Sequence, residues 1–235
     1  MPSTRVNDIE LYYEVTGEGA PVLLIPGLGV DINYFSQIIG QLATKHRVVA
    51  FDPRGAGRSD KPDEPYTIDG MADDAVGLLA HLAIDRTTVV GCSMGGRIAL
   101  SLTLSHPELV ERLVLAAASP NLPPERFPSR RWLMMNVLSR IPLPKSVDPQ
   151  PHYAWEHQRR ASRGFDVTAR LGEIEVPTLV IHGRDDHMVP FSSGQEMADQ
   201  IHGARLVAVS GGHRALFREH AAQLAEEVDQ FMAAS

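Results

Sequence analysis

Short apolar runs alternate with amphipathic stretches over most of the chain. Brief runs of β-branched and aliphatic residues predict strands, whereas apolar residues spaced three and four apart predict helices. On this basis the predicted strands are residues 9–16, 22–25, 47–51, 87–90, 113–117, 178–182 and 205–209. The predicted helices are residues 31–44, 68–82, 97–104, 192–201 and 217–231.

The first predicted strand, residues 9–16, places Leu11, Tyr13 and Val15 among polar neighbours. This alternation indicates a half-exposed edge strand. The glycines of Gly17-Glu18-Gly19 follow directly, and they predict a hairpin turn.

Strands and helices alternate along the rest of the chain, which is typical of an α/β fold. Connections of this kind favour a mostly parallel sheet covered by helices on both faces. Ligands of such sheets bind at the carboxyl ends of the strands, so polar residues just after strands are the first candidates for chemistry.

The alternation stops between residues 120 and 166. This stretch holds eight of the 17 prolines and both tryptophans, and its two short helical patterns fall near residues 130–139 and 153–162. We predict a small helical lid insertion at 120–166, and a core formed by residues 1–119 and 167–235.

The composition fits one globular domain and argues against several classes of protein. Of the 235 residues, 43% are hydrophobic and 22% are charged, and the net charge of -7 disfavours non-specific nucleic-acid binding. No apolar run approaches 18 residues, and the N-terminal residues lack a signal-peptide pattern, so we expect a cytoplasmic protein with no membrane span. Cys92 is the only cysteine, so no intrachain disulfide can form.

The pentapeptide Gly91-Cys92-Ser93-Met94-Gly95 lies between a predicted strand and a predicted helix. In that context the pattern G-x-S-x-G predicts a nucleophile elbow, a sharp turn with a strained serine and no room for side chains at either glycine. Ser93 is therefore the candidate nucleophile. Cys92 lies outside the central position of the elbow, and we interpret it as a packing residue.

A serine nucleophile needs a base and an acid that orients the base. His213 directly follows the last predicted strand and is favoured as the base, with His182 and His187 as weaker rivals. Asp185 and Asp186 both follow the strand that ends at His182, and spacing alone does not separate them.

Taken together, the motifs GCSMGG, DPRGAGRS, GRDDHMVP and GGH resemble those of the α/β-hydrolase fold superfamily over essentially the whole chain. The resemblance implies an eight-stranded-type sheet and a triad in the order serine, aspartate, histidine. Its spacing of the acid selects Asp186. It also implies an oxyanion hole from the backbone N–H groups of Leu28 and Met94.

The loop that would carry Leu28 departs from the family pattern. Many members have His-Gly where this chain has Pro26-Gly27, so a side chain that usually supports the loop is missing. Gly27 and Gly29 would let the backbone approach a substrate closely.

Other polar and aromatic residues have more ordinary interpretations. Asp52, Arg54 and Ser59 of the DPRGAGRS loop are interpreted as a structural turn and ion-pair cluster. The stretch from Asn121 to Arg170 has nine basic and four acidic residues, which indicates either a solvated surface or attraction for an anionic or carrier-bound substrate. Our candidates for the substrate pocket are Gly27, Gly29, Trp132, Trp155 and Met188.

The resulting hypothesis is a serine hydrolase that cleaves a carboxylic ester, thioester or lactone through an acyl-enzyme intermediate. The alternatives are a carbon–carbon bond hydrolase or cofactor-free lyase of the same fold, an aminopeptidase, and a non-catalytic ligand-binding member. No metal-ligand cluster or phosphate-binding loop is evident in the sequence, so we predict no cofactor and no metal, and a small-molecule substrate.

Overall fold

The computed structural model describes residues 2–121 and 149–234, and the strands within them form one eight-stranded sheet. The strands are β1 (Ser3–Val6), β2 (Ile9–Thr16), β3 (Pro21–Ile25), β4 (Arg47–Phe51), β5 (Thr87–Cys92), β6 (Val110–Ala116), β7 (Thr178–Gly183) and β8 (Arg205–Val209). The helices are α1 (Ser36–Leu42), α2 (Ile68–His81), α3 (Met94–Ser105), α5 (His152–Gly164), α6 (Phe191–Gln200), α7 (His213–Leu216) and α8 (Ala221–Ala233).

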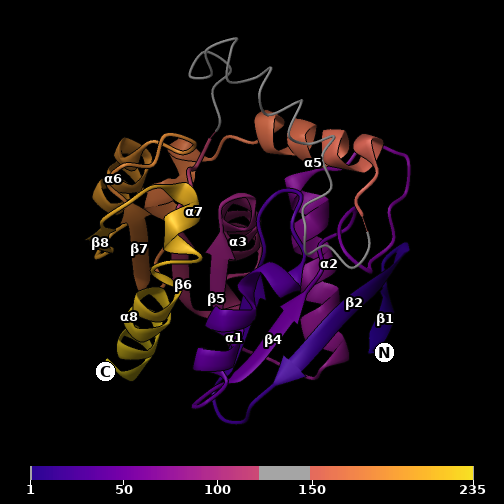
Figure 1. Ribbon diagram of the computed structural model, residues 1–235, viewed down its shortest axis with the longest axis horizontal. Helices are drawn as coiled ribbons and strands as arrows, with labels where there is room; N and C mark the ends of the chain where they lie inside the picture. Colours follow the sequence, from indigo (N-terminus) through magenta and orange to yellow (C-terminus); the bar gives the residue numbers. More distant parts are fainter. Residues whose placement is uncertain (1, 122–148, 235) are drawn as a thin grey trace.

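The strand order is β1-β2-β4-β3-β5-β6-β7-β8. The pairs β1–β2 and β2–β4 are antiparallel, and every neighbouring pair from β4 to β8 is parallel. The carboxyl ends of these parallel strands therefore meet at one edge, beneath α5 (Figure 1). The predicted mostly parallel, eight-stranded α/β sheet is confirmed.

Successive residues of the central strands belong to two separate apolar cores. Val89 packs into the core shared with α2, α3 and α6, whereas Val90 packs into the core shared with α1 and α8. Because both faces are covered, the central strands are apolar at nearly every position instead of alternating.

The N-terminal end of the sheet differs from the expectation in two ways. The edge strand is β1, and β2 lies inside it between β1 and β4. Tyr12 is buried while Val15 is exposed, so the simple alternation of β2 does not identify its buried face. The short length of β1 explains why no periodicity predicts it.

The expected hairpin at Gly17-Glu18-Gly19 is also wrong, because β4 lies between β2 and β3. Gly17 and Gly19 have φ angles of +79° and +110°. A side chain at Gly17 would place its Cβ 2.3 Å from the carbonyl oxygen of His46. The glycines let the chain pass tightly against the residues that precede β4 and cross over it.

The last helix, predicted over residues 217–231, begins later in the structure, as α8, and the separate short helix α7 precedes it. The chain leaves the helical path after Leu216, and Phe217 packs its ring against Phe35 at 5.5 Å between centroids. His220 therefore precedes α8 instead of lying within a helix. The break is stabilised by burial of Phe217, which the 3.6-residue period of the sequence cannot reveal.

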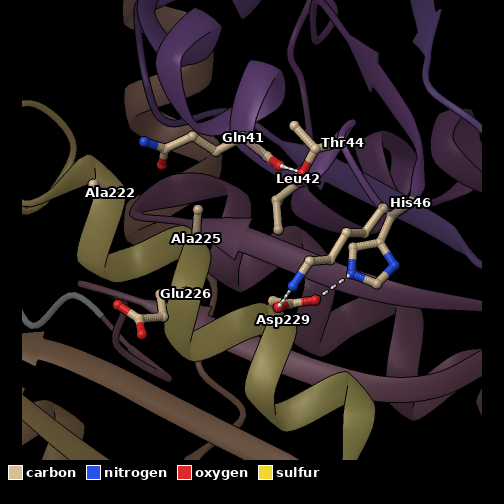
Figure 2. A pocket seen from close by; sticks show the side chains of 9 residues that line it. Gln41, Leu42, Thr44, His46, Ala222, Ala225, Glu226 and Asp229 are labelled. Carbon is tan, nitrogen blue, oxygen red and sulfur yellow. Dashed lines mark hydrogen bonds and ion pairs between the residues drawn. The ribbon is translucent and has the colours of Figure 1, made fainter.

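Helices α1 and α8 pack against each other on one face of the sheet. Asp229 of α8 accepts a hydrogen bond from Lys45 at 2.6 Å and lies 3.0 Å from Nε2 of His46 (Figure 2). The hollow around these residues contains none of the predicted site residues. We interpret the contact as a connection between two helices that closes this side of the core.

The segment that contains α5 leaves and rejoins the core at neighbouring points. Asn121 and Asp166 form an isolated β-bridge, and the backbone N–H of Val167 donates to the carbonyl of Pro120 at 3.1 Å. The helix predicted near residues 153–162 is present as α5. The helix predicted near residues 130–139 lies outside the described residues. The limits of the lid remain a prediction.

Candidate active site

Ser93 lies at the sharp turn between β5 and α3. Its φ and ψ angles of 57° and −115° are strained for a residue with a side chain. A Cβ at Gly95 would lie 2.1 Å from the carbonyl oxygen of Ile25, and one at Gly91 would lie 2.5 Å from that of Gly95. The expectation that only glycine fits at either position is therefore confirmed sterically.

Asp186 lies in the loop after β7 and is buried. Its Oδ1 accepts hydrogen bonds from the backbone N–H groups of Met188 and Val189, each at 2.8 Å. The neighbouring Asp185 instead ties the loop to Gly211, through backbone and side-chain contacts. The two aspartates thus have separate surroundings, and only Asp186 has a carboxylate oxygen directed at a histidine.

His213 is the first residue of α7, immediately beyond the loop that follows β8. Its Nδ1 lies 2.7 Å from Oδ2 of Asp186, and its Nε2 lies 3.0 Å from Oγ of Ser93. An ionised Asp186 can only accept, so Nδ1 carries the proton and Nε2 is left to accept from the serine hydroxyl. The imidazole also packs edge-on against Phe217, at 5.7 Å between ring centroids.

The rival histidine His182 occupies a different environment. It is fully buried, and its Nε2 donates to the carbonyl of Val189 at 3.0 Å. Burial lowers the pKa of its imidazole, which favours the neutral ring. His182 therefore supports the loop that holds Asp186. His187 is exposed in the same loop.

The loop after β3 passes directly over Ser93. A Cβ at Gly27 would lie 3.2 Å from Cβ of Ser93 and 3.7 Å from its Oγ. Leu28 is the next residue, and Met94 begins α3 on the other side of the serine. This geometry supports the predicted pair of backbone donors at Leu28 and Met94, whose role in an oxyanion hole remains a proposal.

Two of the remaining pocket candidates, Gly29 and Trp155, lie next to each other at this loop. Gly29 has a φ of +74°, and a Cβ there would meet the indole of Trp155 at 3.1 Å. Met188 is 39% exposed beside Asp186, which suits a residue at the rim of a site. Trp132 lies outside the described residues.

Gln158 of α5 is a site residue that the sequence pattern does not single out. It is fully buried, and its side-chain oxygen accepts from the N–H of Gly29 at 3.0 Å. Its position between Trp155 and Ser162 on the apolar face of α5 is the one signal that could have identified it, because buried residues recur there at helical spacing. A single glutamine in a helix forms no recognisable sequence motif.

The basic residues of α5 that the structure describes have acidic neighbours. Glu156 pairs with Arg159 and Arg160, and the two guanidinium groups lower the pKa of its carboxyl to about 2. Within these described contacts, part of the positive charge predicted for the lid is neutralised locally.

The DPRGAGRS loop and Cys92 have structural contacts, as expected. Asp52 accepts from the backbone N–H groups of Ile32 and Arg58, and Arg54 forms a buried ion pair with Asp74. Cys92 is fully buried, which raises the pKa of its thiol. Neither group lies in the hydrogen-bonded chain of Ser93, His213 and Asp186.

Residues 2–121 and 149–234 hold no group of three or more His, Cys, Asp or Glu side chains arranged to bind a metal ion. Among the helices in these same ranges, none has both the length and the apolar character needed to span a bilayer.

Comparisons with known proteins identify the family of the chain. The family model described as alpha/beta hydrolase fold matches residues 20–163, and one described as TAP-like protein matches residues 148–235. The putative carbamate hydrolase RutD of Variovorax paradoxus is 35% identical, over 86% of this chain and 89% of the relative. The 2-hydroxymuconate semialdehyde hydrolase of a Pseudomonas strain is 32% identical, over 93% of this chain and 88% of the relative.

Two solved structures are similar to this chain in fold over nearly its whole length. The enol-lactonase of Burkholderia xenovorans superimposes with a TM-score of 0.86 at 26% identity, over 99% of this chain and all of that one. An N-acyl homoserine lactone degrading enzyme superimposes with a TM-score of 0.82 at 27% identity, covering 98% and 100% of the two chains. With a family model and relatives above 30% identity over most of its length, the chain belongs to the alpha/beta hydrolase fold family.

Proposed function

We propose that the chain is a serine hydrolase that cleaves a carboxylic ester, thioester or lactone through an acyl-enzyme intermediate. The observation that carries this proposal is the continuous chain of two hydrogen bonds, 3.0 Å from Ser93 Oγ to His213 Nε2 and 2.7 Å from His213 Nδ1 to Asp186 Oδ2. Both distances lie within the range needed for general-base activation of a nucleophile.

In the first half of the reaction, Oγ of Ser93 attacks the substrate carbonyl while Nε2 of His213 takes the hydroxyl proton. Asp186 holds the imidazole in the required tautomer and stabilises the imidazolium that forms. The backbone N–H groups of Leu28 and Met94 receive the negative charge that develops on the carbonyl oxygen. The imidazolium then donates its proton to the leaving alcohol, thiol or ring oxygen.

In the second half, His213 acts as the base for a water molecule that attacks the acyl group on Ser93. The bond between the acyl carbon and Oγ breaks, and the proton returns from Nε2 to the serine oxygen. Ser93 is thus the nucleophile in the first half and the leaving group in the second, His213 acts as base and then as acid in each half, and Asp186 keeps one role. No further group is required for the balance of protons.

Two observations support an ester or lactone as the substrate. A serine at the elbow provides an acyl-enzyme route, and the structural relatives include enzymes named for lactone substrates. The exposed side chain of Met188 and the indole of Trp155 would supply apolar contacts to the acyl or alcohol part.

The test is a panel of p-nitrophenyl esters of increasing chain length together with lactones, measured with the wild type and Ser93→Ala. We expect turnover by the wild type and a loss of about a millionfold in kcat for the variant, as for other serine triads. Equal, background-level rates for both proteins on every substrate would contradict the proposal.

The sequence relatives favour a second candidate. Curated proteins at 35% and 32% identity are named as a putative carbamate hydrolase and a 2-hydroxymuconate semialdehyde hydrolase. The same three side chains would serve attack on a carbamate carbonyl or cleavage of a carbon–carbon bond beside a ketone. Adding a simple carbamate and a vinylogous diketone to the panel distinguishes these activities, because only the preferred substrate should give a high kcat/KM.

A further inference from the structure

The loop that covers Ser93 has no polar side chain with which to fix its own position. It runs from Pro26 through Gly27 and Leu28 to Gly29, and proline also lacks a backbone N–H. Two glycines further increase the conformational freedom of this stretch. A backbone donor at Leu28 therefore needs support from another part of the chain.

Helix α5 supplies such support through Gln158. The side-chain oxygen of Gln158 accepts from the N–H of Gly29 at 3.0 Å, one residue beyond Leu28. Its side-chain nitrogen donates to the carbonyl oxygen of Arg54 at 2.8 Å, in the loop after β4. The amide of Gln158 thus joins α5 to two loops at the carboxyl edge of the sheet.

The orientation of this amide is fixed by its surroundings. Gln158 is fully buried, and its oxygen also accepts from Nε2 of Gln150 at 2.9 Å. Gln150 donates in addition to the carbonyl of Gly55 at 2.7 Å. Exchanging the oxygen and nitrogen of Gln158 would set donors against the N–H of Gly29 and an acceptor against the carbonyl of Arg54, so one orientation is strongly preferred.

The packing around Gly29 reinforces the contact. A Cβ at Gly29 would lie 3.1 and 3.3 Å from two atoms of the Trp155 indole, so α5 closely approaches the loop one turn before Gln158. On the other side of the loop, a Cβ added at Gly27 would lie 3.2 Å from Cβ of Ser93. The three consecutive residues from Gly27 to Gly29 therefore connect α5 with the candidate nucleophile.

We propose that Gln158 is a positioning residue that holds the N–H of Leu28 in place over Ser93, in the role left open by the absent family histidine. The inference rests on the proposed hydrolase function. Docking of α5 then completes the oxyanion hole, and the lid contributes to the chemical step as well as to substrate binding.

The test uses the full chain with two substitutions of Gln158 and a control. Gln158→Met keeps the length of the side chain and removes all of its amide hydrogen bonds. Gln158→Glu keeps an acceptor for the N–H of Gly29 and, with its carboxyl protonated, also a donor for the carbonyl of Arg54. Ser162→Ala is the matched control, because Ser162 is a buried residue one turn further along α5 whose hydroxyl lacks a hydrogen-bond partner in the structure.

Two readouts separate positioning from folding. One is kcat and KM for the best p-nitrophenyl ester, and the other is the second-order rate of labelling by a fluorophosphonate. In labelling, Ser93 Oγ forms a bond to phosphorus, fluoride leaves, and the hydroxyl proton passes to His213. The charged phosphoryl oxygen occupies the oxyanion hole, so the labelling rate responds to the position of the Leu28 N–H. Thermal unfolding verifies that each variant is folded.

For Gln158→Met we expect kcat and the labelling rate to fall about 10- to 100-fold with KM changed less than about threefold, since small misplacements at a reacting centre have effects of this size. Gln158→Glu should recover to within about fivefold of the wild type, and Ser162→Ala should match it. A folded Gln158→Met that labels at the wild-type rate would overturn the inference. If Gln158→Met does not fold, a folded Gln158→Glu that is labelled about 100-fold more slowly than the wild type would overturn the inference instead.

The two readouts also separate this inference from the function on which it rests. If the wild type is labelled at Ser93 but hydrolyses no ester or lactone, the substrate class is wrong and the labelling rates still test Gln158. If the wild type is not labelled at all, the nucleophile itself is wrong and both proposals fail.

Discussion

Two polar clusters at the carboxyl side of the sheet use similar residue types for different purposes. One consists of Ser93, Asp186 and His213, and the other lies in the loop after β4 around Asp52, Arg54 and Ser59. Both contain a serine and a buried aspartate. They differ in the groups that the side chains contact.

In the loop after β4, the polar atoms are bound to the backbone or to a fixed partner. Both carboxylate oxygens of Asp52 accept from backbone N–H groups, at 2.8 and 2.9 Å. The hydroxyl of Ser59 donates to the carbonyl of Asp52 and accepts from the N–H of Tyr12. Such groups stabilise the fold, because their side chains are directed at the backbone or at a fixed partner.

At the candidate site, the contacts run from side chain to side chain and end at a half-buried hydroxyl. Ser93 Oγ contacts Nε2 of His213, and Oδ2 of Asp186 contacts Nδ1 of the same ring. The two serines differ in the partner of the hydroxyl. Nε2 of His213 can take up the proton of Ser93, whereas the backbone carbonyl that Ser59 contacts can only accept a hydrogen bond. Substitutions in the first cluster should therefore affect activity, and those in the second should affect stability.

After Ser93→Ala, the largest effect is expected for Asp186→Asn. The asparagine oxygen can still accept from the N–H groups of Met188 and Val189, but its amide would donate to Nδ1 and force the wrong tautomer of His213. We expect kcat to fall about ten-thousandfold with the free energy of unfolding changed by less than about 1 kcal/mol. Steady-state kinetics and urea unfolding of the same sample measure both quantities, and a loss of activity explained by unfolding would contradict the prediction.

The next effect is expected for Asp74→Ala. Asp74 is buried and binds both Nε and a terminal nitrogen of Arg54, so its removal leaves a largely buried guanidinium with one remaining acidic partner, Asp8. We expect a loss of about 3–5 kcal/mol in the free energy of unfolding. Asp8→Ala is the control, because Asp8 is mostly exposed and should cost less than about 1 kcal/mol. Equal losses for the two variants would show that burial is not the cause.

A smaller effect is expected in the pH dependence of stability. Burial raises the pKa of Asp52 from 3.8 to about 6. Below about pH 4 this carboxyl is protonated in both the folded and the unfolded chain. Between about pH 4 and 6 the unfolded chain ionises first, so stability decreases as the pH rises, by up to roughly 3 kcal/mol above pH 6.

The measurement is the free energy of unfolding of the wild type minus that of Asp52→Asn, from pH 4 to pH 7.5. This difference should decrease with rising pH, because the asparagine does not ionise. Asp85→Asn removes one charge from the exposed surface and serves as the control. A difference that increases with pH would mean that the backbone N–H groups outweigh burial.

The smallest effect is expected for Ser59→Ala. Its removal leaves the N–H of Tyr12 buried without the hydroxyl as acceptor, which should cost about 1–2 kcal/mol. The kcat should remain within about twofold of the wild type, in contrast to Ser93→Ala. A large loss of activity in folded Ser59→Ala would end the distinction between the two clusters.

The core of the fold and the main site residues could be predicted because each has a local signal. The strand at residues 205–209 has the predicted limits, since apolar residues there stand between clear loop signals. Ser93 and His213 follow from their positions directly after strands. Asp186 needed the family resemblance, because Asp185 has the same residue type in the same loop.

The remaining features depend on contacts between distant residues. The hairpin at Gly17-Glu18-Gly19 was expected from its glycines, yet their conformation serves a close approach to the residues before β4. The end of the helix at Leu216 depends on the burial of Phe217 against Phe35. Gln158 gains its role only when α5 lies against the loop after β3, and no window of sequence contains both.

The position of β8 at the sheet edge makes turnover a sensitive measure of local unfolding. Among the strands that the structure describes, β8 pairs with β7 alone, and His213, which follows β8, is 120 residues away from Ser93 along the chain. Detachment of the C-terminal strand and helices would remove the base while leaving the central strands paired. In a denaturant titration we therefore expect enzymatic activity to disappear before the far-ultraviolet circular dichroism of the sheet changes.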